Sequence, residues 1–219
     1  MKAIVLAAGR GSRMKCLTDD KPKCLVEFQG KPLLEWQLSA LRSSGLSNIA
    51  IVTGYRRELL ANLGLVEFHN PRWAGTNMVS SLACAEDWLK SDTCIVSYSD
   101  IYYSADTVAC LLTTDADLCI TYDPNWFQLW SKRFADPLDD AETFRIDTSI
   151  GKILEIGKRP QSVEEIQGQF MGLILFRPNA WRALQRIRAK LGSQDCAKLD
   201  MTRGLQFLIE SGFQVSGVP

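Results

Sequence analysis

One stretch of the chain decides the fold, and it reads Leu6-Ala7-Ala8-Gly9-Arg10-Gly11-Ser12-Arg13-Met14. The apolar residues 3–6 that lead into the glycines have the character of a fully buried strand. Small residues and glycines let a backbone approach a ligand closely and direct its N–H groups at an anion. The stretch therefore predicts a core strand that continues into a phosphate-binding loop.

Three kinds of ligand-binding loop compete for this stretch. A Walker A loop requires G-x-x-x-x-G-K-[ST], which is absent. A dinucleotide fingerprint requires a third glycine where Met14 stands, which disfavours an NAD-dependent oxidoreductase. The third kind is a nucleoside-triphosphate loop with Arg13 as an added cation. The structural alternative to all three is a glycine-rich turn with a solvated arginine.

Strand-like runs and helix-period segments alternate along the rest of the chain. The expected strands are residues 3–6, 48–53, 94–97, 118–122, 170–176 and 213–215. The expected helices run from Pro32 to Gly45, through Leu59 and Leu60, and over residues 78–89, 105–112, 179–191 and 201–211. This alternation predicts an α/β fold with a Rossmann-like, mostly parallel sheet flanked by helices.

Residues 123–167 differ in composition from their surroundings, because they are rich in Trp, Asp and Pro. A hairpin is expected at residues 144–156, with its turn at residues 149–151. We interpret the segment as a small substrate-side insertion on the sheet. Since the sequence has no repeats and no long linker, residues 1–219 are expected to form a single domain.

The composition excludes several classes of protein. The 25 basic and 25 acidic residues cancel, so no overall field attracts nucleic acid or an anionic membrane. The seven cysteines form no C-x-x-C pair, which indicates neither a zinc site nor a redox dithiol. No run approaches the roughly 20 apolar residues of a membrane span. We therefore expect a cytoplasmic protein with reduced thiols and with neither nucleic-acid nor membrane partners.

The loop continues into a longer pattern that has a known counterpart. L-A-A-G-x-G-x-R-M-x-x-L-T, followed by Pro22-Lys23 and by Gly30-Lys31-Pro32-Leu33-Leu34, resembles the opening of the nucleotidyltransferase family. The resemblance implies a fold of nucleotide-diphospho-sugar transferase type. It also implies a reaction in which an acceptor phosphate oxygen attacks the α-phosphorus of a nucleoside triphosphate and pyrophosphate leaves.

The family reaction requires positioned positive charge and hydrogen-bond donors, and the loop supplies both. The nucleotide-binding candidates here are Leu6, Ala7, Ala8, Gly9, Gly11 and Ser12. The resemblance implies that Arg13 and Lys23 contact the α-phosphate and the departing pyrophosphate, so these two are the catalytic candidates. Lys21 and Lys31 are interpreted as ordinary surface charges.

Asp100 follows the expected strand at residues 94–97 and is the metal candidate. Ligands of open α/β sheets bind beyond the carboxyl ends of the strands, and carboxylate oxygens suit Mg²⁺. The family places a metal-binding aspartate at this point; the alternative is an aspartate that serves loop hydrogen bonds. The family usually adds a second carboxylate in a late strand. The sequence stops at Pro219, where that strand would be approached, so a truncated metal site is one expectation.

A loop that enters a helix at residues 75–82 supplies the base-side candidates. Its pattern T-N-x-x-x-S-L resembles cytidylyltransferases, which implies that Asn77 and Ser81 lie near the nucleotide base or sugar. The alternative is that Asn77 caps the helix, and both roles could hold together. Residues 53–55 end the second core strand and are also expected to border the nucleotide.

The insertion supplies the acceptor-side candidates. Aromatic and cationic side chains alternate there, and the candidates are Trp126, Trp130, Lys132, Arg133, Glu142 and Lys158. A tryptophan face and a carboxylate attract an ammonium group, whereas Lys and Arg hold a phosphate or carboxylate. This mixture suits a zwitterionic acceptor. The alternative is that the aromatic residues only pack the insertion onto the sheet.

Two segments of the insertion resemble the phosphocholine, phosphoglutamine and 2-aminoethylphosphonate cytidylyltransferase group. They are residues 129–142 and 154–158, and relatives use a lysine at the Lys158 position to contact the acceptor phosphate. The resemblance implies CMP transfer from CTP to a small phosphorylated, amine-bearing acceptor, with Mg²⁺, in capsule polysaccharide biosynthesis. A homodimer is one possible assembly. The alternatives are a sugar-1-phosphate nucleotidyltransferase and a catalytically silent, nucleotide-binding regulatory protein.

Overall fold

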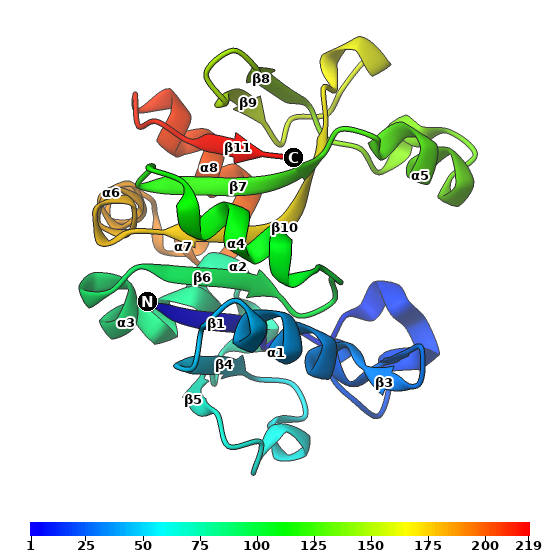
Figure 1. The fold of residues 1–219 in the computed structure, drawn as a ribbon, viewed down its shortest axis with the longest axis vertical. Coiled ribbons are helices and arrows are strands. Elements are labelled where there is room, and N and C mark those ends of the chain that lie inside the picture. The colour runs from blue at the N-terminus through cyan, green and yellow to red at the C-terminus, as the bar shows by residue number, and fades with distance from the viewer.

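A single nine-stranded sheet runs through the computed structural model, which describes residues 1–219 apart from the side chains of Ser12, Arg13 and Lys15. The strand order is β5-β4-β1-β6-β10-β7-β11-β9-β8 (Figure 1). The strands are β1 (Lys2–Ala7), β4 (Ile49–Thr53), β5 (Val66–His69), β6 (Cys94–Tyr98), β7 (Leu118–Asp123), β8 (Phe144–Asp147), β9 (Lys152–Ile156), β10 (Gln169–Phe176) and β11 (Ser216–Val218). A separate two-stranded hairpin consists of β2 (Glu27–Phe28) and β3 (Lys31–Pro32).

Most of the sheet is parallel, as the sequence predicts. β1 pairs in parallel with β4 and β6, β4 with β5, and β11 with β7. β10 is antiparallel to both of its neighbours, β6 and β7, so it joins the two parallel groups. The fold is therefore the expected α/β type, with a central antiparallel strand in it.

Helices cover both faces of the sheet (Figure 1). They are α1 (Leu33–Ser43), α2 (Met78–Leu82), α3 (Glu86–Ser91), α4 (Ala105–Thr113), α5 (Trp126–Arg133), α6 (Pro178–Arg188), α7 (Ser193–Lys198) and α8 (Met201–Glu210). Alternate residues of a strand point to opposite faces, so β1 contributes to two cores. Ala3 and Val5 pack with α1 and α4, whereas Ile4 and Leu6 pack with α2, α3, α6 and α8.

Several elements differ from the sequence prediction. The helix expected over residues 78–89 is divided into α2, a 3₁₀ turn at Ala83–Ala85, and α3. Strand β5 and helices α5 and α7 were not predicted; β5 lies at the sheet edge, where half-exposed side chains give no core-strand signal. The last strand was expected at residues 213–215, but β11 begins at Ser216. The carbonyl of Val215, just before it, accepts a bond from the Ile153 amide at 2.8 Å.

The segment at residues 123–167 extends the sheet. Its hairpin, β8 and β9, joins the edge through the pairing of Lys152 with Ser216 in β11. Phe144 and Ile153 of the hairpin are buried in the same core as Ile120 of β7. The segment is thus packed as part of the main core.

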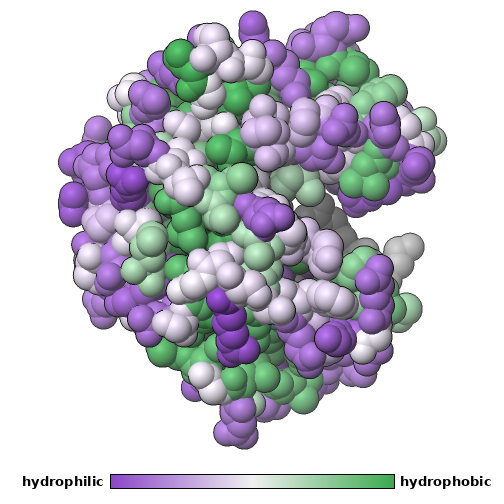
Figure 2. All heavy atoms as spheres, in the orientation of Figure 1, coloured by the Kyte–Doolittle hydropathy of each residue, from purple (hydrophilic) through white to green (hydrophobic). Residues whose placement is uncertain are grey.

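The parallel strands β1, β4 and β6 run in one direction, so their carboxyl ends meet at one edge of the sheet. In Figure 2 the molecule is hollowed by a notch on that side, between the parts that carry α5 and β3 in Figure 1. Loops after parallel strands meet there, which is where ligands of open α/β sheets bind. This edge is therefore where the predicted site residues have to converge.

Candidate active site

The glycine loop leaves β1 directly and is braced from inside. Ala8 is buried behind the loop, whereas Gly9 is exposed. The carbonyl of Gly11 accepts a hydrogen bond from the hydroxyl of the buried Thr18 at 3.1 Å. Gly11 has φ 75°, and a Cβ there would lie 2.1 Å from Cε of Lys23. Only glycine fits at this position, because any side chain would collide with the lysine that crosses the loop.

A second brace comes from the end of β4, at residues 53–55, which the sequence predicts to border the nucleotide. The amide of Tyr55 donates to the carbonyl of Ala8 at 2.9 Å. Gly54 lies so close that a Cβ would be 2.6 Å from the same carbonyl oxygen. The hydroxyl of Tyr55 donates to the carbonyl of Asp19, beyond the loop. These bonds hold the loop backbone against the sheet, so its shape is set before a ligand arrives.

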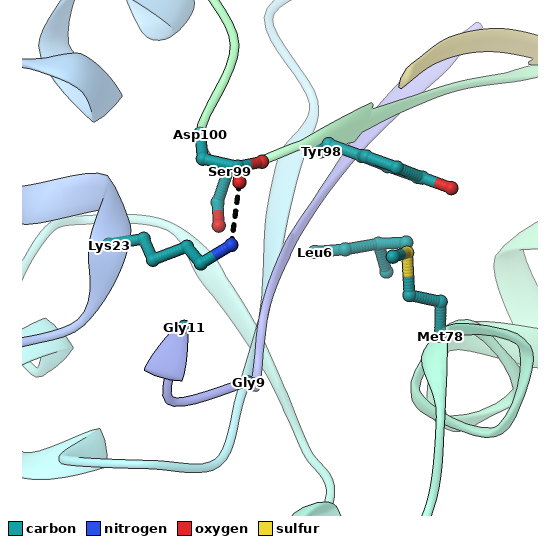
Figure 3. A pocket seen from close by; sticks show the side chains of 8 residues that line it. All are labelled: Leu6, Gly9, Gly11, Lys23, Met78, Tyr98, Ser99 and Asp100. Atoms are coloured by element: carbon teal, nitrogen blue, oxygen red, sulfur yellow. Dashed lines mark hydrogen bonds and ion pairs between the residues drawn. The ribbon is translucent and has the colours of Figure 1, made fainter. Parts of the chain in front are cut away.

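Lys23 and Asp100 form an ion pair over the loop. The distance from Lys23 Nζ to Asp100 Oδ2 is 2.7 Å, and the side chains are 18% and 32% exposed (Figure 3). Lys23 begins a 3₁₀ turn after the extended Pro22, and Asp100 follows the end of β6. Burial, with a smaller contribution from the Asp100 charge, raises the pKa of the adjacent Cys24 thiol to about 12. The two predicted site residues therefore meet, and the thiol beside them stays protonated.

These residues line one cavity with about 530 Å³ of empty space, part of it open to solvent. The lining residues are Leu6, Gly9, Gly11, Lys23, Met78, Tyr98, Ser99 and Asp100. In Figure 3 the Leu6 and Met78 side chains point toward one another, on the side away from the ion pair. The cavity thus has a charged end and an apolar end, a combination that suits the phosphates and the base of a nucleotide.

Tyr98 lines this cavity, although the sequence analysis did not select it. Its ring meets Phe170 edge-on at 5.7 Å, and a Cβ on Gly172 would be 2.7 Å from that ring. Burial, and then the charges of Asp200, Glu142 and Asp100, raise the pKa of the phenol well above its usual value. The hydroxyl therefore remains protonated.

The side chain of Asn77 forms hydrogen bonds with backbone groups. Its Oδ1 accepts from the amide of Met78 at 2.8 Å at the start of α2, and its Nδ2 donates to the carbonyl of Lys198 at 3.2 Å. Ser81 is buried and accepts a bond from Nδ2 of Asn70 at 3.0 Å. Asn77 therefore caps α2, as the alternative interpretation expects. Contact of Asn77 or Ser81 with a nucleotide base stays a prediction.

The structure places Trp126 and Trp130 in the core, 3% and 8% exposed, and they do not line the cavity beside Lys23. Trp126 Nε1 donates to the carbonyl of Ile166 at 3.1 Å, which fixes α5 to the insertion. Lys132 and Arg133 are exposed at the end of α5, where the Arg133 guanidinium lies 5.2 Å from the Trp130 ring. In this structure both tryptophans therefore pack in the core, and their contact with an acceptor stays a prediction.

Glu142 and Lys158 line a second, open cavity with about 770 Å³ of empty space. Its lining, which we call the mixed-charge groove, is Leu138, Asp139, Asp140, Ala141, Glu142, Gly157, Lys158 and Arg159. The two sides are joined by backbone bonds, since the Thr143 amide donates to the Lys158 carbonyl at 2.8 Å. Lys158 Nζ lies 2.6 Å from Glu155 Oε2, and Glu142 accepts a bond from Thr202 at 3.4 Å. The groove thus presents charges of both signs.

Two predicted residues, Ser12 and Arg13, have side chains that lie outside the described residues. Met78, Tyr98 and Ser99 are lining residues that sequence reasoning missed. The signal that could have found them is position: Tyr98 and Ser99 precede Asp100, and Met78 lies between the two base-side candidates.

A glycine loop follows β1, and an ion pair of a lysine and an aspartate closes over it, at the edge where ligands of open α/β sheets bind. Residues 3–198 match the MobA-like NTP transferase domain family. The chain belongs to this family and is a nucleotidyltransferase.

Relatives within the class include the expected cytidylyltransferases. The chain is 41% identical to CTP:phosphoglutamine cytidylyltransferase of Campylobacter jejuni over 186 residues, which cover 80% of this chain and 73% of the relative. It is 29% identical to 2-aminoethylphosphonate cytidylyltransferase of Lancefieldella rimae, over 71% of this chain and 60% of the relative. The resemblance to this group is therefore confirmed.

A solved structure of CTP:phosphocholine cytidylyltransferase from Streptococcus pneumoniae superposes with a TM-score of 0.72. The match covers 99% of this chain and 88% of the neighbour at 21% sequence identity. The expected nucleotide-diphospho-sugar transferase type of fold is therefore confirmed.

Proposed function

We propose that the chain transfers CMP from CTP to a small phosphorylated acceptor that carries an amine, and releases pyrophosphate. The observation that carries the proposal is the convergence of the glycine loop, Lys23 and Asp100 on one cavity. The choice of CTP and of an aminated acceptor, with phosphoglutamine first, is supported by the 41% identity to the Campylobacter jejuni relative.

The proposed chemistry needs positioning and charge neutralisation more than covalent help. An ionised oxygen of the acceptor phosphate attacks the α-phosphorus of CTP. The bond from that phosphorus to the oxygen bridging the α- and β-phosphates breaks, and its electron pair leaves with pyrophosphate. The loop amides supply fixed dipoles, and Lys23 supplies a compact charge for the phosphate oxygens. Because the attacking oxygen is already ionised, no side-chain base is required.

The donor chemistry around Asp100 fits a Mg²⁺ ion that is held largely by its substrate. Among the described residues no group of three or more His, Cys, Asp or Glu side chains surrounds a common point. Mg²⁺ often binds through one or two carboxylates, several waters and substrate phosphates, so a single aspartate at the cavity is a sufficient protein ligand. When bound, the ion would neutralise phosphate charge. Arg13 remains a catalytic candidate by its place in the family motif.

We assign the amine-bearing end of the acceptor to the mixed-charge groove. Asp139, Asp140 and Glu142 suit an ammonium group, and Lys158 and Arg159 suit a carboxylate or phosphate. The Glu142 charge contributes to raising the pKa of Tyr98, so a groove residue acts electrostatically on a residue of the nucleotide cavity. An acceptor that spans both sites would present its phosphate to CTP and its charged tail to the groove. Lys132 and Arg133, exposed on α5, are additional acceptor candidates.

The test is pyrophosphate release with Mg²⁺ over a matrix of substrates. The nucleotides are CTP, UTP, GTP and ATP, and the acceptors are phosphoglutamine, phosphocholine, 2-aminoethylphosphonate and glucose-1-phosphate. We expect release with CTP and one aminated acceptor, and little with the other nucleotides. Release with glucose-1-phosphate and UTP would instead identify a sugar-1-phosphate nucleotidyltransferase. Binding of CTP without release in any pair would identify a regulatory nucleotide-binding protein.

Three further properties belong to the same proposal. They are a cytoplasmic location, a homodimeric assembly and a place in capsule polysaccharide biosynthesis. None of the described helices is long and apolar enough to cross a bilayer. Fractionation of the producing cell and sedimentation of the purified protein test the first two directly.

A further inference from the structure

Gln37 connects α1 to the loop that carries Asp100. The side chain is fully buried, and its Nε2 donates to the carbonyl of Tyr98 at 2.9 Å and to the carbonyl of Ile101 at 2.6 Å. These two carbonyls stand on either side of Ser99 and Asp100 in the chain. One amide group thus bridges the two ends of the short segment that presents the carboxylate.

This segment needs an outside partner because it leaves the sheet ladder. Strand β6 ends at Tyr98, and residues 99–103 have no regular secondary structure. Buried backbone carbonyls without a ladder need other donors, and leaving one unpaired is costly. The Ser97 hydroxyl donates to the Tyr98 carbonyl at 2.8 Å, and Gln37 supplies the second bond there and the bond at Ile101. The loop conformation is therefore tied to α1.

The neighbouring residue of α1 contacts the outer side of the same loop. The Trp36 ring meets the Tyr102 ring edge-on at 5.8 Å, and Tyr102 in turn lies 5.4 Å from Phe28. Trp36 Nε1 also donates to the carbonyl of Phe28 at 2.8 Å. Phe28 belongs to the hairpin that follows the turn of Lys23. Through these contacts α1 touches the segments on both sides of the ion pair.

We propose that Gln37 is the positioning residue that holds the Asp100 carboxylate at the cavity, and that this placement sets the affinity for a metal–nucleotide complex. The inference rests on the proposed metal role of Asp100, and its geometric part is independent of that role. Gln37 itself is separated from the cavity by the loop that it holds. Its effect is therefore transmitted through the position of Asp100.

The variant Gln37→Met keeps the length and apolar volume of the side chain and removes both hydrogen bonds. Gln185→Met in α6 is the matched control, because Gln185 is partly buried, hydrogen-bonds Glu86 and Arg188, and lies outside the cavity lining. The first measurement is hydrogen exchange in the free protein. Peptides covering residues 98–103 should exchange roughly tenfold faster in Gln37→Met only, as expected for the loss of two buried hydrogen bonds.

The second measurement is binding of Mn²⁺ with a non-hydrolysable CTP analogue, followed by electron paramagnetic resonance. Loss of a supporting residue typically weakens metal binding about 10- to 100-fold, so this range is expected for Gln37→Met and no change for Gln185→Met. Binding of the analogue in EDTA should stay within about twofold, since the glycine loop is untouched. If Gln37→Met does not fold, Ser97→Ala, which removes the other donor to the Tyr98 carbonyl, should give smaller changes in the same directions.

The outcomes separate the two proposals. Unchanged exchange at residues 98–103, or equal weakening of analogue binding with and without metal, would overturn the positioning role. A lower melting temperature with unaltered Mn²⁺ affinity would leave Gln37 a purely structural residue and overturn it too. Failure of the wild-type protein to bind the Mn²⁺–nucleotide complex would instead contradict the proposed function. Hydrogen exchange at residues 98–103 would still report the hydrogen bonds of Gln37 to this loop.

Discussion

Lys23 Nζ and Asp100 Oδ2 lie 2.7 Å apart, although 77 positions separate the two residues in sequence. Each side chain satisfies the charge of the other in the ligand-free protein. The proposed reaction uses the same two groups on different partners, the lysine on phosphate and the aspartate on a metal ion. Binding of a metal–triphosphate therefore has to exchange one internal ion pair for two external ones. The partly exposed pair is screened by solvent, so this exchange carries a modest cost.

The first prediction concerns the charge on Asp100. Asp100→Asn keeps the shape of the side chain and removes its charge, so kcat/KM with Mg²⁺ should fall roughly 100-fold or more. Binding of a CTP analogue in EDTA should be equal or tighter, because a negative charge near the phosphates is lost and Lys23 is released. Isothermal titration and initial rates measure both. Asp106→Asn, exposed in the first turn of α4, is the control. Unchanged Mg²⁺ dependence in Asp100→Asn would refute the metal role.

The second prediction concerns Gly11. Gly11→Ala places a Cβ 2.1 Å from Cε of Lys23 and forces a non-glycine residue to φ 75°. The backbone conformation alone costs about 1–2 kcal/mol, so the melting temperature should fall by several degrees. Gly9→Ala is the matched control for stability, since within the described chain its Cβ would meet no heavy atom inside 4 Å. Thermal melting measures the effect, and equal melting of the two variants would contradict the close approach.

The third prediction concerns alkaline stability. Burial raises the pKa of the Cys24 and Cys94 thiols to about 12 and that of Cys119 to about 11. Unfolded thiols ionise near their ordinary value of about 8.5, so above this pH ionisation favours the unfolded state. The stability is fully present below pH 8.5 and should decline progressively towards pH 11–12. Urea midpoints at pH 8, 9 and 10 measure the decline.

A cysteine variant isolates the thiol contribution to that decline. Cys24→Ala removes one of the buried titrating groups, so its midpoint should fall less steeply with pH than that of the wild type. The absolute stability of the variant does not matter, because only the slopes are compared. Parallel curves for the two proteins would show that other groups cause the alkaline loss.

The fourth prediction concerns the acceptor groove. Lys158→Met should raise KM for the aminated acceptor about 10- to 100-fold, the usual consequence of losing one charge-assisted hydrogen bond. KM for CTP should remain within about twofold, because Lys158 does not line the nucleotide cavity. Lys152→Met, at the start of β9, is the control for removing a lysine from the same part of the chain. A change in both Michaelis constants would argue against a separate acceptor site.

Sequence reasoning predicted the elements whose signal is strongest. Predominantly apolar runs marked β1, β6, β7 and β10, because strands buried on both faces are rich in apolar residues. The edge strand β5 was not predicted, because its side chains are exposed or only partly buried beside β4. The 3₁₀ turn that divides the helix at residues 78–91 also left no sequence signal.

The site was predictable where chemistry constrains spacing. Lys23 and Asp100 were found from a motif and from the end of a core strand, and the structure brings both to one cavity. The structure buries Trp126 in the core, and its contact with an acceptor stays a prediction. The sequence alone does not distinguish a tryptophan in a ligand pocket from a tryptophan in a core. The packing of α5 on the insertion is visible only in the structure. Met78 and Tyr98 line the cavity, but the sequence analysis did not select either residue.

The antiparallel strand β10 has a consequence for the order of folding. Residues 169–176 pair with β6 on one side and β7 on the other. These two strands therefore cannot be joined in one sheet until about three quarters of the chain has left the ribosome. Until then β6 and β7 present unpaired edges, which are sites for association with other chains. Non-local pairing of this kind also slows folding, because long loops must close before the contacts form. The strand that joins the two parallel groups of the sheet therefore also influences how quickly the new chain folds and how long it is exposed to association with other chains.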